Sequence, residues 1–226
     1  RPTLVIVGGP PGAGKTTVAA GLAEKLGWAV IRSDQVRREV VGADPWGGSP
    51  EWLSAPFSSA VTQGTYAAMV RRASVLLGTG ESLILDATWA TEPPPALAAT
   101  AAAETGSAFV ALHCRAPLAV AERRVARRIA AGAAISTATV NIVRRLAGSF
   151  APWPSAQPID SAAAIAETLT QALSAVRGAT TATPRPSEHT ARPRPASAAT
   201  SRSSSRIEFQ CPPFALSSAT ITSSCG

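Results

Sequence analysis

The sequence predicts an α/β fold in which a doubly wound, five-stranded parallel sheet is covered by helices on both faces. Short apolar runs rich in β-branched residues alternate along the chain with segments whose apolar residues recur at helical spacing. Alternation of this kind gives parallel strands joined by right-handed crossovers, which place helices on both sides of the sheet. Ligand sites in such sheets lie at the carboxyl ends of the strands.

The first strand and the first helix are the clearest elements. The run TLVIVG at residues 3–8 is apolar and β-branched, which is typical of a buried strand. In the segment 15–26, Val18, Leu22 and Leu26 recur at helical spacing, and Gly27 follows as a helix stop.

The next elements follow the same alternation. A second strand is expected at 29–34, and a short helix after it with Asp34 as its N-terminal cap. A long helix around 58–77 leads through the turn at 78–80 to a third strand. The third, fourth and fifth strands are expected at 82–88, 108–114 and 158–160, and further helices at 95–105, 117–132, 136–148 and 161–177.

The last part of the chain has a different composition. Serine, threonine, proline and alanine dominate residues 179–226, without sustained periodicity. Such a segment cannot bury enough apolar surface to offset its ordering entropy. We therefore expect a folded domain at 1–178 and a disordered, low-complexity tail at 179–226.

The composition limits the partners and the compartment. The net charge is +7, and the five arginines and two glutamates of the tail contribute to it. Because the chain has no dense basic run, a nucleic-acid surface has little support. Three cysteines without metal-ligand spacing fit a reducing compartment. With no signal peptide and no long apolar run, we expect a cytoplasmic protein that does not enter a membrane. The start at Arg1 is compatible with excision from a longer, fused protein.

Five glycines and prolines separate the first strand from the first helix, in the pattern Gly9-x-x-x-x-Gly14-Lys15-Thr16. Glycines let successive backbone N–H groups turn inward around a phosphate, and the helix N-terminus adds its positive dipole. Lys15 is expected to reach the β and γ phosphates, and the Thr16 hydroxyl to bind Mg²⁺. An ordinary strand–turn–helix corner is the alternative. The expected nucleotide-binding residues are Gly9, Pro10, Pro11, Gly12, Ala13, Gly14, Lys15, Thr16 and Thr17.

Two aspartates follow predicted strands. Asp86 ends LILD and is expected to orient the Mg²⁺ shell, with a plain strand-end cap as the alternative. Asp34 is expected to accept the proton of an attacking substrate hydroxyl, and a role only in capping its helix is the alternative. Arg37, one turn later, is expected to hold an anionic or polyhydroxylated acceptor.

Four arginines lie in the segment AERRVARRIAAG at 121–132, where Glu122 is the only acid. Arg124 and Arg128 fall on one helical face, as do Arg123 and Arg127. Their mutual repulsion favours a mobile lid that closes around phosphates and excludes water. A solvated helix face is the alternative.

The chain resembles the small P-loop kinase family often described as AAA-type (AAA_33) proteins. The resemblance rests on four segments and their order along the chain: GGPPGAGKTT, IRSDQVRRE, LILDATW and AERRVARR. Gluconate kinases, shikimate kinases, chloramphenicol phosphotransferases and zeta-toxin kinases are related to this family. The resemblance covers about residues 2–178 and implies the three-layer sandwich of the P-loop NTPases. In actinobacteria the same domain occurs fused behind an aminoglycoside-phosphotransferase-like domain.

The resemblance also implies site roles. It places Lys15, Thr16 and Thr17 at the phosphates and Mg²⁺, and Asp86 near the metal. It suggests Asp34 as the base, Arg37 at the acceptor, and Arg124 and Arg128 as lid residues that contact ATP, with Lys15, Asp34 and Arg128 as the catalytic set. The chain departs from the family where it reads AAISTAT at 133–139, since relatives carry acidic residues there, and in WATEPPPALA, where an arginine is often found.

The expected activity is ATP- and Mg²⁺-dependent transfer of the γ-phosphate to a hydroxyl of an unidentified small molecule. Two alternatives remain open at this point. The first is a regulatory module that binds or hydrolyses ATP without an acceptor, and the second is a basic protein associated with nucleic acid. A GTPase is not expected, because no N/TKxD segment occurs and Lys15 and Lys25 are the only lysines.

Overall fold

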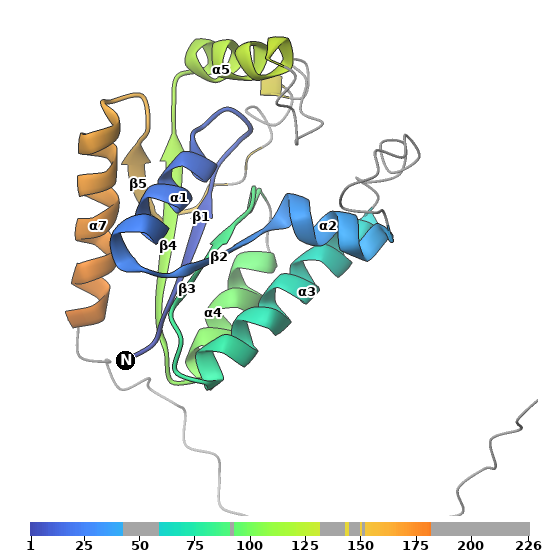
Figure 1. The fold of residues 1–226 in the computed structure, drawn as a ribbon, viewed down its shortest axis with the longest axis vertical. Helices are drawn as coiled ribbons and strands as arrows, with labels where there is room; N and C mark the ends of the chain where they lie inside the picture. The colour runs from blue at the N-terminus through green and yellow to red at the C-terminus, as the bar shows by residue number, and fades with distance from the viewer. Residues whose placement is uncertain (43–58, 91–92, 132–142, 145–149, 151, 182–226) are drawn as a thin grey trace, which may run out of the picture. The chain divides into compact units, whose positions relative to one another are not determined.

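The computed structural model describes residues 1–42, 59–90, 93–131, 143–144, 150 and 152–181 (Figure 1). All of them belong to one compact unit, Arg1–Pro184. Five parallel strands form one sheet in the order β2-β3-β1-β4-β5, which confirms the predicted doubly wound α/β fold. The strands are β1 (Thr3–Gly8), β2 (Ala29–Arg32), β3 (Leu83–Asp86), β4 (Ala108–Arg115) and β5 (Gln157–Asp160).

The helices connect these strands as the sequence predicts. They are α1 (Lys15–Leu26), α2 (Ser33–Val41), α3 (Ser59–Gly78), α4 (Pro94–Glu104), α5 (Leu118–Ala130) and α7 (Ile165–Thr181). The helix expected at 136–148 falls outside the described residues except for 143–144, which are helical. No helix in the described part of the chain has both the length and the apolar character needed to cross a bilayer.

The two faces of the sheet carry separate cores because alternate residues of each strand point to opposite sides. Val5 and Val7 of β1 pack in one cluster with residues of α1 and α7. These two helices approach closely at Gly21, where a Cβ would lie 2.6 Å from Leu169 Cδ2. In Figure 1, α1 and α7 lie together on this side of the sheet.

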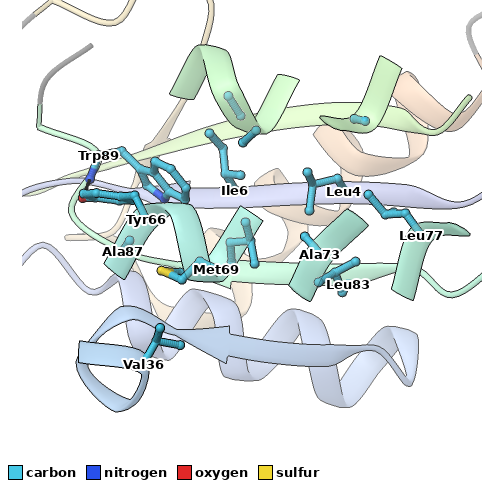
Figure 2. Packing of buried hydrophobic residues seen from close by; sticks show 14 of the residues in the cluster. Leu4, Ile6, Val36, Tyr66, Met69, Ala73, Leu77, Leu83, Ala87 and Trp89 are labelled. Atoms are coloured by element: carbon cyan, nitrogen blue, oxygen red, sulfur yellow. Dashed lines mark hydrogen bonds between the residues drawn. The ribbon is translucent and has the colours of Figure 1, made fainter. Parts of the chain in front are cut away.

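Leu4 and Ile6 of β1 point to the other face, where they pack against α3 and α4. Figure 2 shows Met69 and Leu77 of α3 lying against them. The central strand is therefore buried on both sides, which explains why its sequence is apolar without alternation.

Aromatic residues fill this second core near the carboxyl end of β1. A Cβ on Gly8 would lie 2.4 Å from Trp153 Cζ3 and 3.0 Å from Trp89 Cδ1. Trp89, which has a φ of 52°, donates its backbone N–H to the Tyr66 hydroxyl over 3.1 Å, and the two rings pack 4.9 Å apart (Figure 2). Glycine at position 8 therefore allows the aromatic side chains to approach the start of the loop that follows.

Several boundaries differ from the expectation by one to four residues, and two of these differences have a structural explanation. Helix α2 begins at Ser33 directly after β2, so Asp34 lies in its first turn and does not cap it; no side chain caps this helix. The prediction of Asp34 as the cap was wrong because no connecting residue separates the strand from the helix. The Asp34 carboxylate still lies near the positive end of the helix dipole.

Helix α7 begins at Ile165 rather than 161 and continues to Thr181, three residues into the segment expected to be disordered. The helix extends because Ala179 still packs against the core beside Val176. The rest of the predicted tail, 182–226, lies outside the described residues.

Candidate phosphate-binding site

The glycine loop joins β1 to α1 at the carboxyl edge of the sheet. Gly9, Gly12 and Gly14 have φ values of 137°, 82° and 82°, a region that residues with side chains rarely adopt. The loop is closed by a hydrogen bond from Ala13 N–H to the Pro10 carbonyl over 3.1 Å. The three glycines therefore make this backbone path possible.

The loop also lies against the backbone of two other elements. A Cβ on Gly9 would lie 2.5 Å from the Cys114 carbonyl oxygen of β4, and a Cβ on Gly12 would lie 2.4 Å from the Ala121 carbonyl oxygen of α5. Backbone cannot move aside as a flexible side chain can. Any larger residue would push the loop out of this cradle.

Lys15 begins α1, and its side chain turns back over the loop. Its Nζ donates a hydrogen bond to the Pro10 carbonyl over 3.1 Å. Burial lowers the pKa of Lys15, while the charges of Asp86 and Asp34 act in the opposite direction. A negatively charged ligand beside this ammonium would favour its charged form.

Thr16 and Asp86 meet at the foot of the loop. The Thr16 hydroxyl donates to Asp86 Oδ2 over 2.8 Å, although the residues are 70 positions apart. Strand pairing brings them together, because Asp86 is the register partner of Val7 on β1. Burial raises the pKa of Asp86, and this effect is opposed by Lys15 and by the Thr16 hydrogen bond.

This pair matches the donors that Mg²⁺ prefers. The ion takes hard oxygen ligands, usually one or two from the protein, with water and phosphate oxygens completing the shell. No group of three or more His, Cys, Asp or Glu that could hold a metal occurs among the described residues. The hydroxyl and carboxylate oxygens of Thr16 and Asp86 fit a Mg²⁺ ion that is shared with a bound phosphate.

A cavity of about 480 Å³ opens beside the loop. Its described lining residues include four cationic side chains and no carboxylate. The cationic residues are Lys15, Arg124, Arg127 and Arg128, and the other lining residues include Thr16, Thr17, Ser161, Ala163, Ile165 and Thr168. Glu122, the acid nearest in sequence to the three arginines, forms an ion pair with Arg144 over 2.6 Å. The cavity therefore suits a polyanion.

Sequence reasoning missed Ser161, which directly follows β5. The Ser161 hydroxyl lies 2.6 Å from the Ala13 carbonyl oxygen of the loop and 2.8 Å from the Arg115 carbonyl oxygen of β4. Its position directly after the last strand, at the carboxyl edge of the sheet, was the only signal in the sequence. Serine is too common after strands for that signal to be specific.

The two residues expected at the acceptor lie elsewhere. Neither Asp34 nor Arg37 is among the described residues that line the cavity. Asp34 is exposed at the carboxyl end of β2, near enough for its charge to raise the pKa of Lys15. Arg37 Nη1 donates to Thr62 Oγ1 of α3 over 3.2 Å. Burial lowers the pKa of Arg37, whereas Tyr66 and Asp34 act to raise it.

The comparison with protein families agrees with this geometry. The family profile of the AAA domain matches residues 4–153, about two thirds of the chain. The chain belongs to this AAA domain family, AAA_33. Curated relatives of this AAA domain include uncharacterized proteins of Mycobacterium tuberculosis and Mycobacterium bovis, each 39% identical over 160 residues. The aligned part covers 70% of this chain and 32% of each relative, so the chain spans about a third of their length.

Solved structures show the same fold for this AAA domain. A putative kinase from Chloroflexus aurantiacus is 23% identical with a TM-score of 0.59, and the match covers 79% of this chain and 97% of the other. The Mycobacterium tuberculosis APS kinase, solved with AMPPNP and APS, is 22% identical with a TM-score of 0.56, covering 78% and 97%. A gluconokinase from Sinorhizobium meliloti is 16% identical with a TM-score of 0.54, covering 79% and 94%. The AAA domain therefore has the P-loop NTPase fold.

Cys114 gives a test of the packing beneath the loop. Its side chain is fully buried, and burial raises the pKa of the thiol to about 12. Because the thiolate is the reactive form, we expect native protein to leave Cys114 unmodified by iodoacetamide between pH 7 and pH 9. Mass spectrometry of the peptide measures this, with denatured protein as the reactive control. Alkylation of Cys114 at the same rate in native and denatured protein would show that the loop does not cover it.

Proposed function

We propose that this AAA domain is an ATP- and Mg²⁺-dependent phosphotransferase that moves the γ-phosphate to a hydroxyl of a small molecule. The single observation that carries the proposal is the Thr16–Asp86 pair, 2.8 Å apart at the foot of a glycine loop with Lys15 above it. A phosphate loop needs a hydroxyl, a strand-end acid and a lysine in this relation in order to bind a metal–nucleotide complex.

The triphosphate would lie along the loop from Gly9 to Thr17, where backbone N–H groups and the α1 N-terminus face it. Lys15 would bind the β and γ phosphates, while Arg128 would neutralise charge on the transferring group. The purine nucleoside would occupy the part of the cavity lined by Ala163, Ile165 and Thr168. This arrangement places the γ-phosphate near the carboxyl end of β1.

Thr16 and Asp86 would hold the Mg²⁺ ion, which would supply positive charge to neutralise the phosphates. The chain's own contribution is to fix both oxygens before the ligand arrives. Asp86 is rigid at the end of a buried strand, and the hydrogen bond to Thr16 fixes the orientation of its carboxylate. Preorganised oxygens of this kind bind without further reorganisation.

On the acceptor side, Asp34 would accept the proton of the attacking hydroxyl. Its position in the first turn of α2 at the carboxyl end of β2, with Lys15 within electrostatic reach, supports this role. Arg37, one turn later and hydrogen-bonded to Thr62, would bind an anionic or polyhydroxylated part of the acceptor. Transfer would then be direct and in line, with catalysis mostly by positioning.

We propose that residues 1–178 form the catalytic domain and that residues 179–226 have no catalytic role. We also propose that the protein is located in the cytoplasm. Because the chain matches 32% of its curated relatives, we propose that the domain works as one part of a longer protein. The sequence AAISTAT at 133–139, which lacks the acidic residues expected there, favours a second candidate, a regulatory ATPase module without an acceptor. A hydroxylated metabolite that stimulates ADP release would support the kinase, and a full panel without stimulation would support the regulatory module.

Replacement of Lys15 tests the phosphate site. In Lys15→Ala we expect phosphoryl transfer to fall by at least about 100-fold, because the cation on the β and γ phosphates is lost. The fold should persist, since the side chain makes one hydrogen bond to the loop. ADP production with a panel of hydroxylated metabolites measures the first effect and circular dichroism the second. Turnover equal to that of the wild type in a folded variant would exclude this role.

Replacement of Asp34 tests the acceptor side. Asp34→Asn keeps the size of the side chain but removes its capacity to accept a proton. We expect the rate of transfer to fall about 10²–10⁴-fold while Mg·ATP affinity stays within a factor of about two. Single-turnover transfer and calorimetry separate the two quantities. If the transfer kinetics were unchanged, Asp34 would not be the base.

A further inference from the structure

Helix α5 is joined to the glycine loop by the side chain of Arg124. Its Nη2 donates to the Ser161 carbonyl over 2.7 Å, and its Nη1 to the Gly12 carbonyl over 3.4 Å. Arg124 is half-buried, and both partners are neutral backbone oxygens. One guanidinium therefore connects the loop, the helix and the segment after β5.

Ser161 connects the segment after β5 to the glycine loop and to the end of β4. Its backbone N–H donates to the Arg115 carbonyl at the end of β4 over 3.0 Å, and its hydroxyl lies 2.6 Å from the Ala13 carbonyl oxygen. The junction is tight, since a Cβ on Gly14 would lie 3.3 Å from Ser161 Cβ and 3.4 Å from Arg124 Nη1. Ser161 is itself buried.

The next arginines on the helix differ from Arg124. Arg127 and Arg128 line the cavity with exposed side chains, and no hydrogen bond joins either of them to another described residue. Arg128 lies one turn beyond Arg124 on the same face. It is also close enough to Lys15 for its charge to lower the pKa of that lysine. With respect to the described residues, the donors of Arg128 are therefore available to a ligand, whereas those of Arg124 are engaged by the protein.

We propose that Arg124 and Ser161 are positioning residues that form a strut between α5 and the glycine loop, and that this strut holds Arg128 over the phosphate site. The inference deepens the proposed function and rests on it for the role of Arg128. It departs from the expectation that Arg124 itself contacts ATP. The planar guanidinium reaches two carbonyls at once, which the single ammonium of a lysine does not reproduce.

The unfolding temperature without nucleotide distinguishes a strut from a phosphate ligand. Hydrogen bonds to a charged group stabilise a fold of this size measurably, so we expect Arg124→Gln to lower the midpoint by about 3–10 °C. Arg124→Lys should recover less than half of that loss. Arg128→Gln and Arg123→Gln remove the same charge from the same helix and should leave the midpoint within about 1 °C.

Affinity for Mg·ATP tests positioning rather than stability alone. Below the unfolding temperature, we expect Arg128→Gln to weaken binding at least about tenfold in the wild-type background. In the Arg124→Gln and Ser161→Ala backgrounds, Arg128→Gln should weaken Mg·ATP binding by less than about threefold, because Arg128 is no longer held in place. Calorimetry with the full chain measures all six proteins, and Arg123→Gln serves as the matched control in each background.

Two outcomes would overturn the strut. The first is an unchanged or raised midpoint for nucleotide-free Arg124→Gln together with weakened ATP binding, which would make Arg124 a phosphate ligand. The second is full additivity of the effects of Arg124→Gln and Arg128→Gln on the free energy of Mg·ATP binding. If no protein binds Mg·ATP, the proposed function fails, while a lower midpoint in Arg124→Gln and in Ser161→Ala would still support the junction itself.

Discussion

The approach of the glycine loop to neighbouring backbone is the constraint on which this structure depends. Gly9 lies against the Cys114 carbonyl and Gly12 against the Ala121 carbonyl, at separations that leave no room for a Cβ. This contact fixes where α1 begins, so that Lys15 turns back over the loop and Thr16 meets Asp86. It also brings α5, with its arginines, to the edge of the same cavity. One backbone path thus sets the positions of Lys15, Thr16 and the arginines of α5.

The distribution of charge follows from that path. Asp86 is buried at the foot of the loop, behind Thr16, and hydrogen-bonded to it. The cavity in front carries cationic side chains, and the carboxylate of Glu122 pairs with Arg144 instead. Like charges held close together without a counter-ion repel one another, so an anion that binds there relieves the repulsion. The charge of the cavity is therefore suited to a polyanion before one is bound.

Much of this arrangement could be predicted from the sequence. The apolar runs locate the strands, and the glycine pattern between a strand and a helix locates the loop, because both depend on local backbone chemistry. The position of Asp86 follows from strand order in a parallel sheet. The start of α2 was mispredicted because local propensity does not reveal that β2 passes into it without a connecting residue. Ser161 and the Gly8–Trp153 contact depend on segments about 145 residues apart meeting in space, which no local pattern records.

Calorimetric titration of the folded 226-residue chain with ATP, with and without Mg²⁺, tests the central claim most directly. The account predicts saturable binding of one equivalent, weakened by at least about tenfold when Mg²⁺ is removed or when Thr16 is replaced by alanine. It also predicts much weaker binding of AMP, which lacks the β and γ phosphates that Lys15 would hold. Absence of saturable binding by protein with native circular dichroism, or equal affinity for AMP and ATP, would contradict it.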